Sequence, residues 1–110
     1  MVGGSSPFGG RTRTAVLLAL RLLSESYARE LARVLGAPLS GVQQALQGLE
    51  RDGLVAGRVM GRTRLYRIAP GYFARRELEA FLLRLTEPER NLRLQVEMLR
   101  RTPRRMGGSR

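Results

Sequence analysis

Arginine is the residue type through which this chain can do most of its chemistry. All 20 basic residues are arginines, they face only 9 acidic residues, and the net charge is +11. A field of that sign attracts polyanions such as nucleic acid or anionic lipid. The guanidinium fork suits bidentate contacts with phosphates and guanine edges. An arginine-only habit is explained equally well by genome composition, so charge predicts an anionic partner without identifying it.

Four of the arginines lie in one short stretch that contains no acid. Residues 53–70, GLVAGRVMGRTRLYRIAP, hold two β-type runs, 54–60 and 64–69, joined by Gly-Arg-Thr, where the glycine permits a tight hairpin turn. Its arginines are Arg58, Arg62, Arg64 and Arg67. With no acid between Asp52 and Glu77, we expect these charges to need an external counterion. The alternative is a hairpin that is merely solvated.

Side-chain alternation divides the two faces of this hairpin. It places Tyr66 and Ile68 on one face, expected to be the core face, and Leu65 with Arg67 on the other. Arginines near the tip, at 62 and 64, are free to reach phosphate or a narrow minor groove. Those at 58 and 67 could instead brace the hairpin against the domain.

The helix predicted at residues 39–52 has two chemically different faces. Its apolar residues are Leu39, Val42, Leu46 and Leu49. The opposite face carries Ser40, Gln44, Gln47 and Arg51, flanked by Gly41, Gln43 and Gly48. Glutamine can pair bidentately with adenine, and serine or arginine can reach base edges or phosphates. The alternative is the plain polar side of an amphipathic helix, and Ser40 and Gln43 also match an S-x-x-Q capping box.

Gly48 lies in the middle of this helix, where glycine costs about 1 kcal/mol relative to alanine. Two explanations stand at this point. The glycine either admits a close backbone approach or faces the preceding helix.

Helices at about 12–23, 28–35 and 39–52 precede the hairpin, and helices at 74–85 and about 86–101 follow it. The first is apolar enough to be largely buried, and a T-x-x-E capping box, Thr86 with Glu89, opens the last. At 110 residues we expect one domain. Residues 1–10 form a predicted flexible leader, and residues 103–110 form a basic flexible tail. Two helices, a tight turn, a third helix and a hairpin are typical of a winged helix-turn-helix.

The stretch LARVLGAPLSGVQQALQGLERDGLVAGRVMGRTRLYRI resembles the recognition helix and wing of bacterial ArsR-type regulators. The matching positions are Val42, Leu46, Leu49, Gly53, Leu54, Val55, Arg58, Gly61, Arg62, Tyr66 and Ile68. The resemblance covers roughly residues 14–85. It implies a homodimeric repressor whose third helices enter successive major grooves, with Gly41, Gln43 and Gln44 at the base-facing positions.

Two departures from that family pattern bear on function. Metal-sensing members use cysteine and histidine ligands, and this chain has neither, so metal sensing through those ligands is excluded. The histidines usual before Leu46 are replaced by Gln44 and Ala45, so the preferred DNA sequence should differ. We expect no metal and no cofactor.

The last helix, and the two arginines before the first helix, offer further contacts. Leu92, Val96 and Leu99 form an apolar stripe, widened by Leu94 and Met98, which predicts a dimer interface; the alternative is that the helix folds back on its own domain. Arg11 and Arg13 precede the first helix and could extend the phosphate contact.

Other functional classes find little support in the sequence. The acidic pairs Glu77/Glu79 and Glu87/Glu89 are two residues apart, so on a helix they point away from each other. Residues 9–14, GGRTRT, lack the preceding strand and the lysine of a phosphate-binding loop. The longest apolar run, 15–20, is too short to span a membrane, and no signal-peptide pattern opens the chain. The absence of cysteine fits a reducing cytoplasm, where we expect the protein to act.

The sequence therefore predicts a mainly α (α+β) fold. A winged helix-turn-helix with a two-stranded wing occupies residues 11–85, and a C-terminal helix for dimerisation occupies 86–102. We expect a non-enzymatic, sequence-specific regulator that binds double-stranded DNA as a homodimer, with an effector or partner protein left open. The candidate DNA-binding residues are Ser40, Gly41, Gln43, Gln44, Gln47, Arg51, Arg58, Arg62, Thr63 and Arg64. The alternatives are a winged-helix adaptor for a partner protein and a nucleic-acid module without sequence preference, one that could act on RNA.

Overall fold

The computed structural model describes residues 10–72 and 74–101, which form five α-helices and one three-stranded antiparallel sheet. The predicted tail at 103–110, and the predicted leader apart from Gly10, lie outside the described residues.

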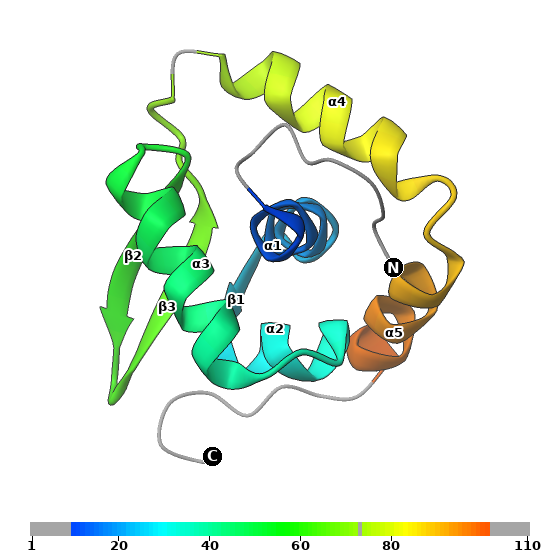
Figure 1. The fold of residues 1–110 in the computed structure, drawn as a ribbon, viewed down its shortest axis with the longest axis horizontal. Coiled ribbons are helices and arrows are strands. Elements are labelled where there is room, and N and C mark those ends of the chain that lie inside the picture. The colour runs from blue at the N-terminus through cyan, green and yellow to red at the C-terminus, as the bar shows by residue number, and fades with distance from the viewer. Residues whose placement is uncertain (1–9, 73, 102–110) are drawn as a thin grey trace.

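Helix α1 (Arg11–Leu23) is the centre of the fold. Figure 1 views it end on, with α2, α3, α4 and α5 arranged around it. Its apolar residues point in every direction, and each residue from Thr14 to Leu20 is buried. A helix that is hydrophobic all round must be covered on all sides, so the sequence-based prediction of a largely buried first helix is confirmed.

The helix-turn-helix consists of α2 (Ala28–Leu35) and α3 (Leu39–Arg51). Gly36 ends α2 in the left-handed conformation (φ 62°, ψ 36°) that glycine adopts most readily. Leu31 of α2 and Val42, Leu46 and Leu49 of α3 are fully buried in one core cluster with α1. The apolar stripe of α3 therefore fixes which of its faces remains outside.

The sheet contains one strand more than predicted. β2 (Val55–Met60) and β3 (Thr63–Ile68) form the expected hairpin, hereafter the wing, and β1 (Glu25–Tyr27) pairs antiparallel with the other edge of β3. The two-stranded wing was predicted, but β1 was missed because three residues are too short to show a period. Ser26 is buried within β1, where its hydroxyl donates a 2.6 Å hydrogen bond to Glu30.

The wing turn is tighter than the predicted Gly-Arg-Thr, because Met60 pairs with Thr63 and leaves only Gly61 and Arg62 between the strands. Gly61 has φ 63°, which favours glycine. Ile68 faces the core as predicted and Tyr66 packs against it. Leu65, expected on the outer face with Arg67, is also buried, because the unpredicted β1 pairs Tyr27 directly opposite it.

Helices α4 (Arg75–Thr86) and α5 (Arg90–Arg101) complete the shell around α1. The capping-box prediction for α5 was wrong: Thr86 is the last residue of α4, and its hydroxyl donates to the Leu83 carbonyl at 2.6 Å.

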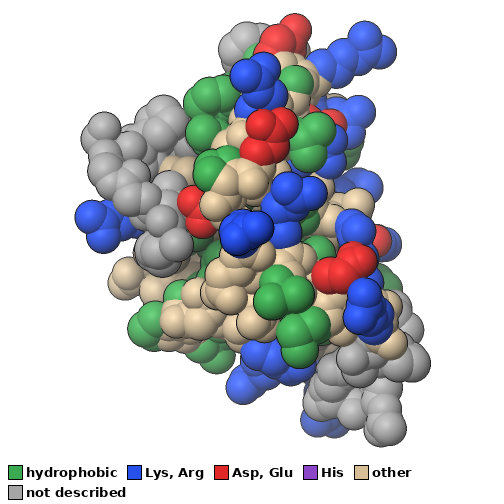
Figure 2. Space-filling view, turned by 90° about the vertical axis from the view of Figure 1, so that its right-hand side faces the viewer, with side chains coloured by type: hydrophobic (Ala, Val, Ile, Leu, Met, Phe, Trp, Pro, Cys, Tyr) green, Lys and Arg blue, Asp and Glu red, His purple; other side chains and the backbone are tan. Residues whose placement is uncertain are grey.

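Helix α5 folds back on its own domain, the alternative to the predicted dimer stripe. Leu92 and Val96 are buried in the core cluster, with Leu99 packed against it, and Arg100 donates a hydrogen bond to the Leu22 carbonyl of α1. Hydrophobic side chains still lie between arginines on the side of the molecule that carries α5 (Figure 2). The exposed large hydrophobic residues of the two last helices are Phe81, Leu83, Leu94 and Met98. No helix within the described residues is long and apolar enough to cross a membrane.

Candidate nucleic-acid interface

The outer face of α3 carries the side chains that the sequence singled out. Ser40, Gln43, Gln44, Gln47 and Arg51 are all exposed, and Gly41 is half-buried. Pro38 is the N-cap of α3 and no side chain caps it, so the S-x-x-Q capping box does not form. The helix begins at Leu39, which puts Ser40 inside the first turn. The hydroxyl and amide groups of this face therefore point to solvent as a row of donors and acceptors.

The inner side of α3 explains Gly48. A Cβ on Gly48 would lie 2.5 Å from Nη2 of Arg13, so the guanidinium of Arg13 lies across the helix at this residue. The three atoms nearest to that Cβ all belong to the Arg13 side chain, so the neighbour of Gly48 is neither a backbone nor α2. The glycine provides room for an arginine of α1.

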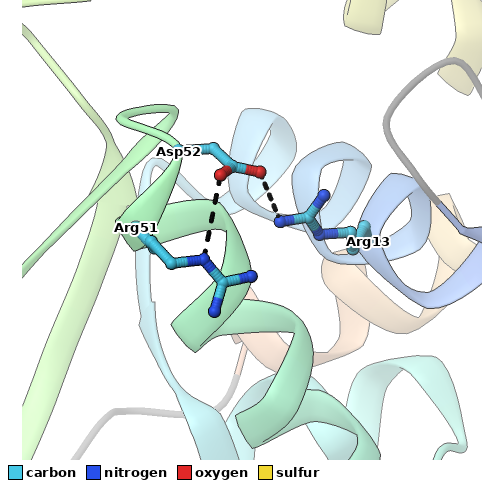
Figure 3. A network of polar contacts seen from close by, with 3 residues as sticks. All are labelled: Arg13, Arg51 and Asp52. Atoms are coloured by element: carbon cyan, nitrogen blue, oxygen red, sulfur yellow. Dashed lines mark hydrogen bonds and ion pairs between the residues drawn. The ribbon is translucent and has the colours of Figure 1, made fainter.

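Arg13 reaches over Gly48 to Asp52, the C-cap of α3. Its Nη2 donates to Asp52 Oδ2 at 2.7 Å, while the other carboxylate oxygen of Asp52 lies 3.9 Å from Nε of Arg51 (Figure 3). Arg13 is therefore engaged inside the molecule and holds the C-terminal end of α3 to α1. The expectation that Arg13 extends a phosphate contact is replaced by this structural role. The side chain of Arg51 remains 76% exposed.

The wing lies beside the C-terminal half of α3 (Figure 1). Residues 61–63 form its tip, and all three are exposed. Among the described residues, Arg62 has no acidic partner. The polar face of α3 and Arg62 at the wing tip are thus both exposed, as the sequence predicted.

Arg64 is placed differently from Arg62, although both were expected to be free. Its Nη2 donates to Glu50 Oε2 of α3 at 2.6 Å, and its guanidinium lies 6.0 Å from the ring centre of Tyr66. This hydrogen bond, and the negative charge of Glu50, raise the pKa of Arg64. Burial raises the pKa of Tyr66, and the charge of Glu50 adds to it. Both groups therefore keep their protonated forms at neutral pH.

Arg58 also has an internal partner, Glu25 of β1, at 3.4 Å. Arg67 is exposed and, in the part of the chain that the structure describes, has no ion pair. The expectation that all four wing arginines need an external counterion was therefore wrong for two of them. The acids that neutralise them lie outside the hairpin in sequence and reach it only through the fold.

Comparison with solved structures finds proteins of similar fold. HlyU from Vibrio cholerae matches with a TM-score of 0.58 and 29% sequence identity, over 72% of this chain and 77% of its own. The winged helix-turn-helix DNA-binding domain Mb0332 from Mycobacterium bovis, a possible ArsR-family transcriptional regulator, is homodimeric in solution. It matches with a TM-score of 0.57 and 25% identity, over 79% of this chain and 91% of its own. The chain therefore has an ArsR-like winged helix-turn-helix fold.

Similarity to this ArsR-like fold extends to more distant structures. A variant of ZitR from Lactococcus lactis matches with a TM-score of 0.60 at 17% identity, over 93% of this chain and 68% of its own, which shows the fold alone. No protein-family model and no curated protein sequence matches the chain.

The ArsR-like fold also carries residues at this site that the sequence analysis missed. They are Glu50, Asp52 and Gly57. Glu50 is seven residues from Gln43 and three from Gln47, so helical spacing alone could have placed it beside the polar face. A glycine inside a strand, such as Gly57, is a recognised sign of close approach. Within the described residues, no three acidic side chains form a group that could hold a metal ion.

Proposed function

We propose that this protein is a transcriptional regulator that binds double-stranded DNA as a homodimer and represses by occupying its site. The observation that carries the proposal is the exposed Ser/Gln/Arg face of α3 beside an arginine-tipped wing on an ArsR-like fold. In winged helix-turn-helix proteins a helix in this position lies in the major groove. The likeness to Mb0332, a DNA-binding domain, supports the same role here.

The roles of the α3 residues follow from their chemistry. Gln43, Gln44 and Gln47 can each present an amide to a base edge, with adenine the best bidentate match. Ser40 and Arg51, near the two ends of the face, are assigned to phosphates or neighbouring base edges. Gly41 lets the first turn approach the DNA backbone without a side chain between them.

In the wing, Arg62 and Thr63 are assigned to phosphate or minor-groove contact. Both are exposed at the tip, where a side chain can follow the DNA backbone. Arg58 and Arg64 hold Glu25 and Glu50 in the free protein, so any DNA contact from them competes with an internal ion pair.

The homodimer is proposed to use the outer face of α5. Leu92 and Val96 are buried within the chain, which leaves Leu94 (57% exposed) and Met98 (54% exposed), four residues apart on one face. Exposed apolar patches of this kind mark association surfaces. The homodimeric state of Mb0332 supports a two-fold assembly, and a two-fold protein matches a pseudo-palindromic site.

The proposal assigns DNA binding to residues 11–85 and dimerisation to 86–102, in a cytoplasmic, non-catalytic protein without a cofactor. An effector or a partner protein would act on this same dimer.

Duplex binding tests the proposal directly. Fluorescence anisotropy with labelled duplexes should show an affinity that falls steeply as salt is added, because neutralised phosphates release counterions. The proposal fails if no duplex is bound at low salt while a partner protein co-purifies, which favours an adaptor. Equal affinity for every duplex and for RNA favours a module without sequence preference.

A further inference from the structure

Glu50 is an acid in an unexpected place. It is the one acidic residue of α3, and it lies on the flank of the face that carries Gln43 and Gln47. A carboxylate facing DNA repels phosphate, so a protein with a net charge of +11 gains no affinity from it. Its position therefore calls for another role.

The hydrogen-bond partner of Glu50 indicates this role. Oε2 of Glu50 accepts the 2.6 Å hydrogen bond from Arg64 Nη2, which joins α3 to the middle of the wing. The two side chains are 33% and 42% exposed, so the pair adds little to global stability. Its effect is on where the wing lies relative to α3.

Gly57 leaves the space through which the side chain of Arg64 crosses the face of the sheet. This glycine is opposite Tyr66 in the ladder, and a Cβ on it would lie 2.6 Å from Nε of Arg64 and 3.0 Å from Cε1 of Tyr66. Its backbone does not adopt the left-handed conformation that would call for glycine. A glycine in mid-strand weakens the strand, so its use here is the space that it leaves for Arg64.

We propose that Glu50 is a positioning residue that fixes the wing against α3 through Arg64, so that Arg64 acts on Glu50 while Arg62 acts on DNA. This inference rests on the proposed function and assigns the wing residues their separate parts within it. The pair sets the distance between the base-reading side chains of α3 and the wing tip. Sequence selectivity then depends on Glu50, although Glu50 contacts no base.

The first test needs no DNA. In the free protein, the ¹⁵N order parameter of the Gly61 amide at the wing tip should fall in Glu50→Gln and in Arg64→Gln. It should recover in the charge-swapped double variant E50R/R64E. Arg67→Gln removes the same charge from the same strand without an ion pair among the described residues, and should leave Gly61 unchanged. Equal order at Gly61 in wild type and all variants overturns the proposal.

The second test uses a duplex selected by the wild-type protein, compared with random duplex. Glu50→Gln and Arg64→Gln should each lower the ratio of specific to random affinity by about tenfold, and the swapped variant should restore it. Arg64→Gln should leave the salt slope unchanged, whereas Arg62→Gln should lower it by about one. A slope that falls equally for both, with no recovery in the swap, makes Arg64 a phosphate contact and overturns the proposal.

The two tests separate the two claims. If the wild-type protein binds no duplex, the proposed function fails, while the Gly61 measurement still decides whether Glu50 positions the wing.

Discussion

The wing arginines are chemically identical, but each differs in what lies beside it. Arg58 and Arg64 hold acids at 3.4 and 2.6 Å, while Arg62 and Arg67 hold none among the described residues. An arginine already paired must give up that partner to bind a phosphate, so pairing ranks the four as DNA contacts. Arg62, unpaired and at the tip, ranks first.

Replacing Arg62 with alanine should weaken binding to every duplex sequence to a similar extent. One lost phosphate contact lowers the slope of log K against log salt by about one unit. A salt titration by anisotropy measures this slope, with Arg67→Ala, an exposed arginine of β3 away from the wing tip, as the matched control. An unchanged slope in Arg62→Ala would remove Arg62 from the interface.

Replacing Gln44 with alanine should instead change which sequence is preferred. Loss of a bidentate base contact costs about 1–3 kcal/mol at one base pair and nothing at random duplex. Comparing the sequences selected by wild type and variant reveals the position, and Gln95→Ala on α5 serves as the control. Identical preferences would assign Gln44 to the plain polar side of a helix.

Sequence reasoning identified the chemistry of these residues but not their partners. The exposed polar face of α3 and the free Arg62 were predicted, because helical and strand periods are local. Glu25 and Glu50 are 33 and 14 residues from the arginines they bind, so only the folded chain brings them together. The ranking of the wing arginines therefore could not come from the hairpin alone.

Among the elements, α3 is the one whose placement matters most, and it is held at its C-terminal end from two sides. Arg13 of α1 crosses Gly48 to reach Asp52, and Arg64 of the wing reaches Glu50. The apolar stripe of α3 packs the helix against the core, and these two ion pairs restrict its rotation about its own axis.

Gly48→Ala tests the contact with α1. Alanine gains about 1 kcal/mol over glycine inside a helix, but its Cβ would displace the Arg13 guanidinium from beside Asp52. The substitution should therefore raise the free energy of unfolding more in an Arg13→Ala background than in wild type. Urea denaturation of the four proteins measures the difference, and an equal gain in both backgrounds would show that Arg13 does not pack on Gly48.

The helices and strands predicted correctly are those long enough to show a periodic pattern, and the element that was missed is too short to show one. Helix α2 was predicted at its observed bounds, and α3 ends one residue before the predicted end. Strand β1 has three residues, too few to show alternation, and its pairing with β3 is what buries Leu65. The capping boxes at Ser40 and Thr86 matched in spacing alone, since Pro38 precedes one helix and Thr86 closes another.

In the whole molecule, α5 has one apolar face that packs in the core and a second that is exposed. Leu92 and Val96 close the core over α1, and Leu94 and Met98 lie outside. The apolar stripe predicted from the sequence is present, and the chain itself covers part of it, which is the alternative that the sequence left open. The outer part is the surface that we propose a second copy covers.

Leu94→Asp should therefore shift the protein towards monomer without unfolding it. Sedimentation equilibrium should show a dimer for wild type and a higher dissociation constant for the variant, with little change in Tm. Leu92→Ala is the contrasting variant, expected to cost about 2–5 kcal/mol of folding stability because it opens a cavity in the core. A wild-type monomer at all concentrations, or an unaffected dimer in Leu94→Asp, would contradict this assignment.

Selection of bound duplexes from a random pool is the decisive experiment for a homodimeric DNA-binding regulator, since it reports sequence reading and two-fold symmetry together. A sequence-specific homodimer should enrich a pseudo-palindrome whose half-site centres are about 10–10.5 base pairs, or a multiple, apart. Failure to enrich any sequence under low-salt conditions would contradict the proposed function.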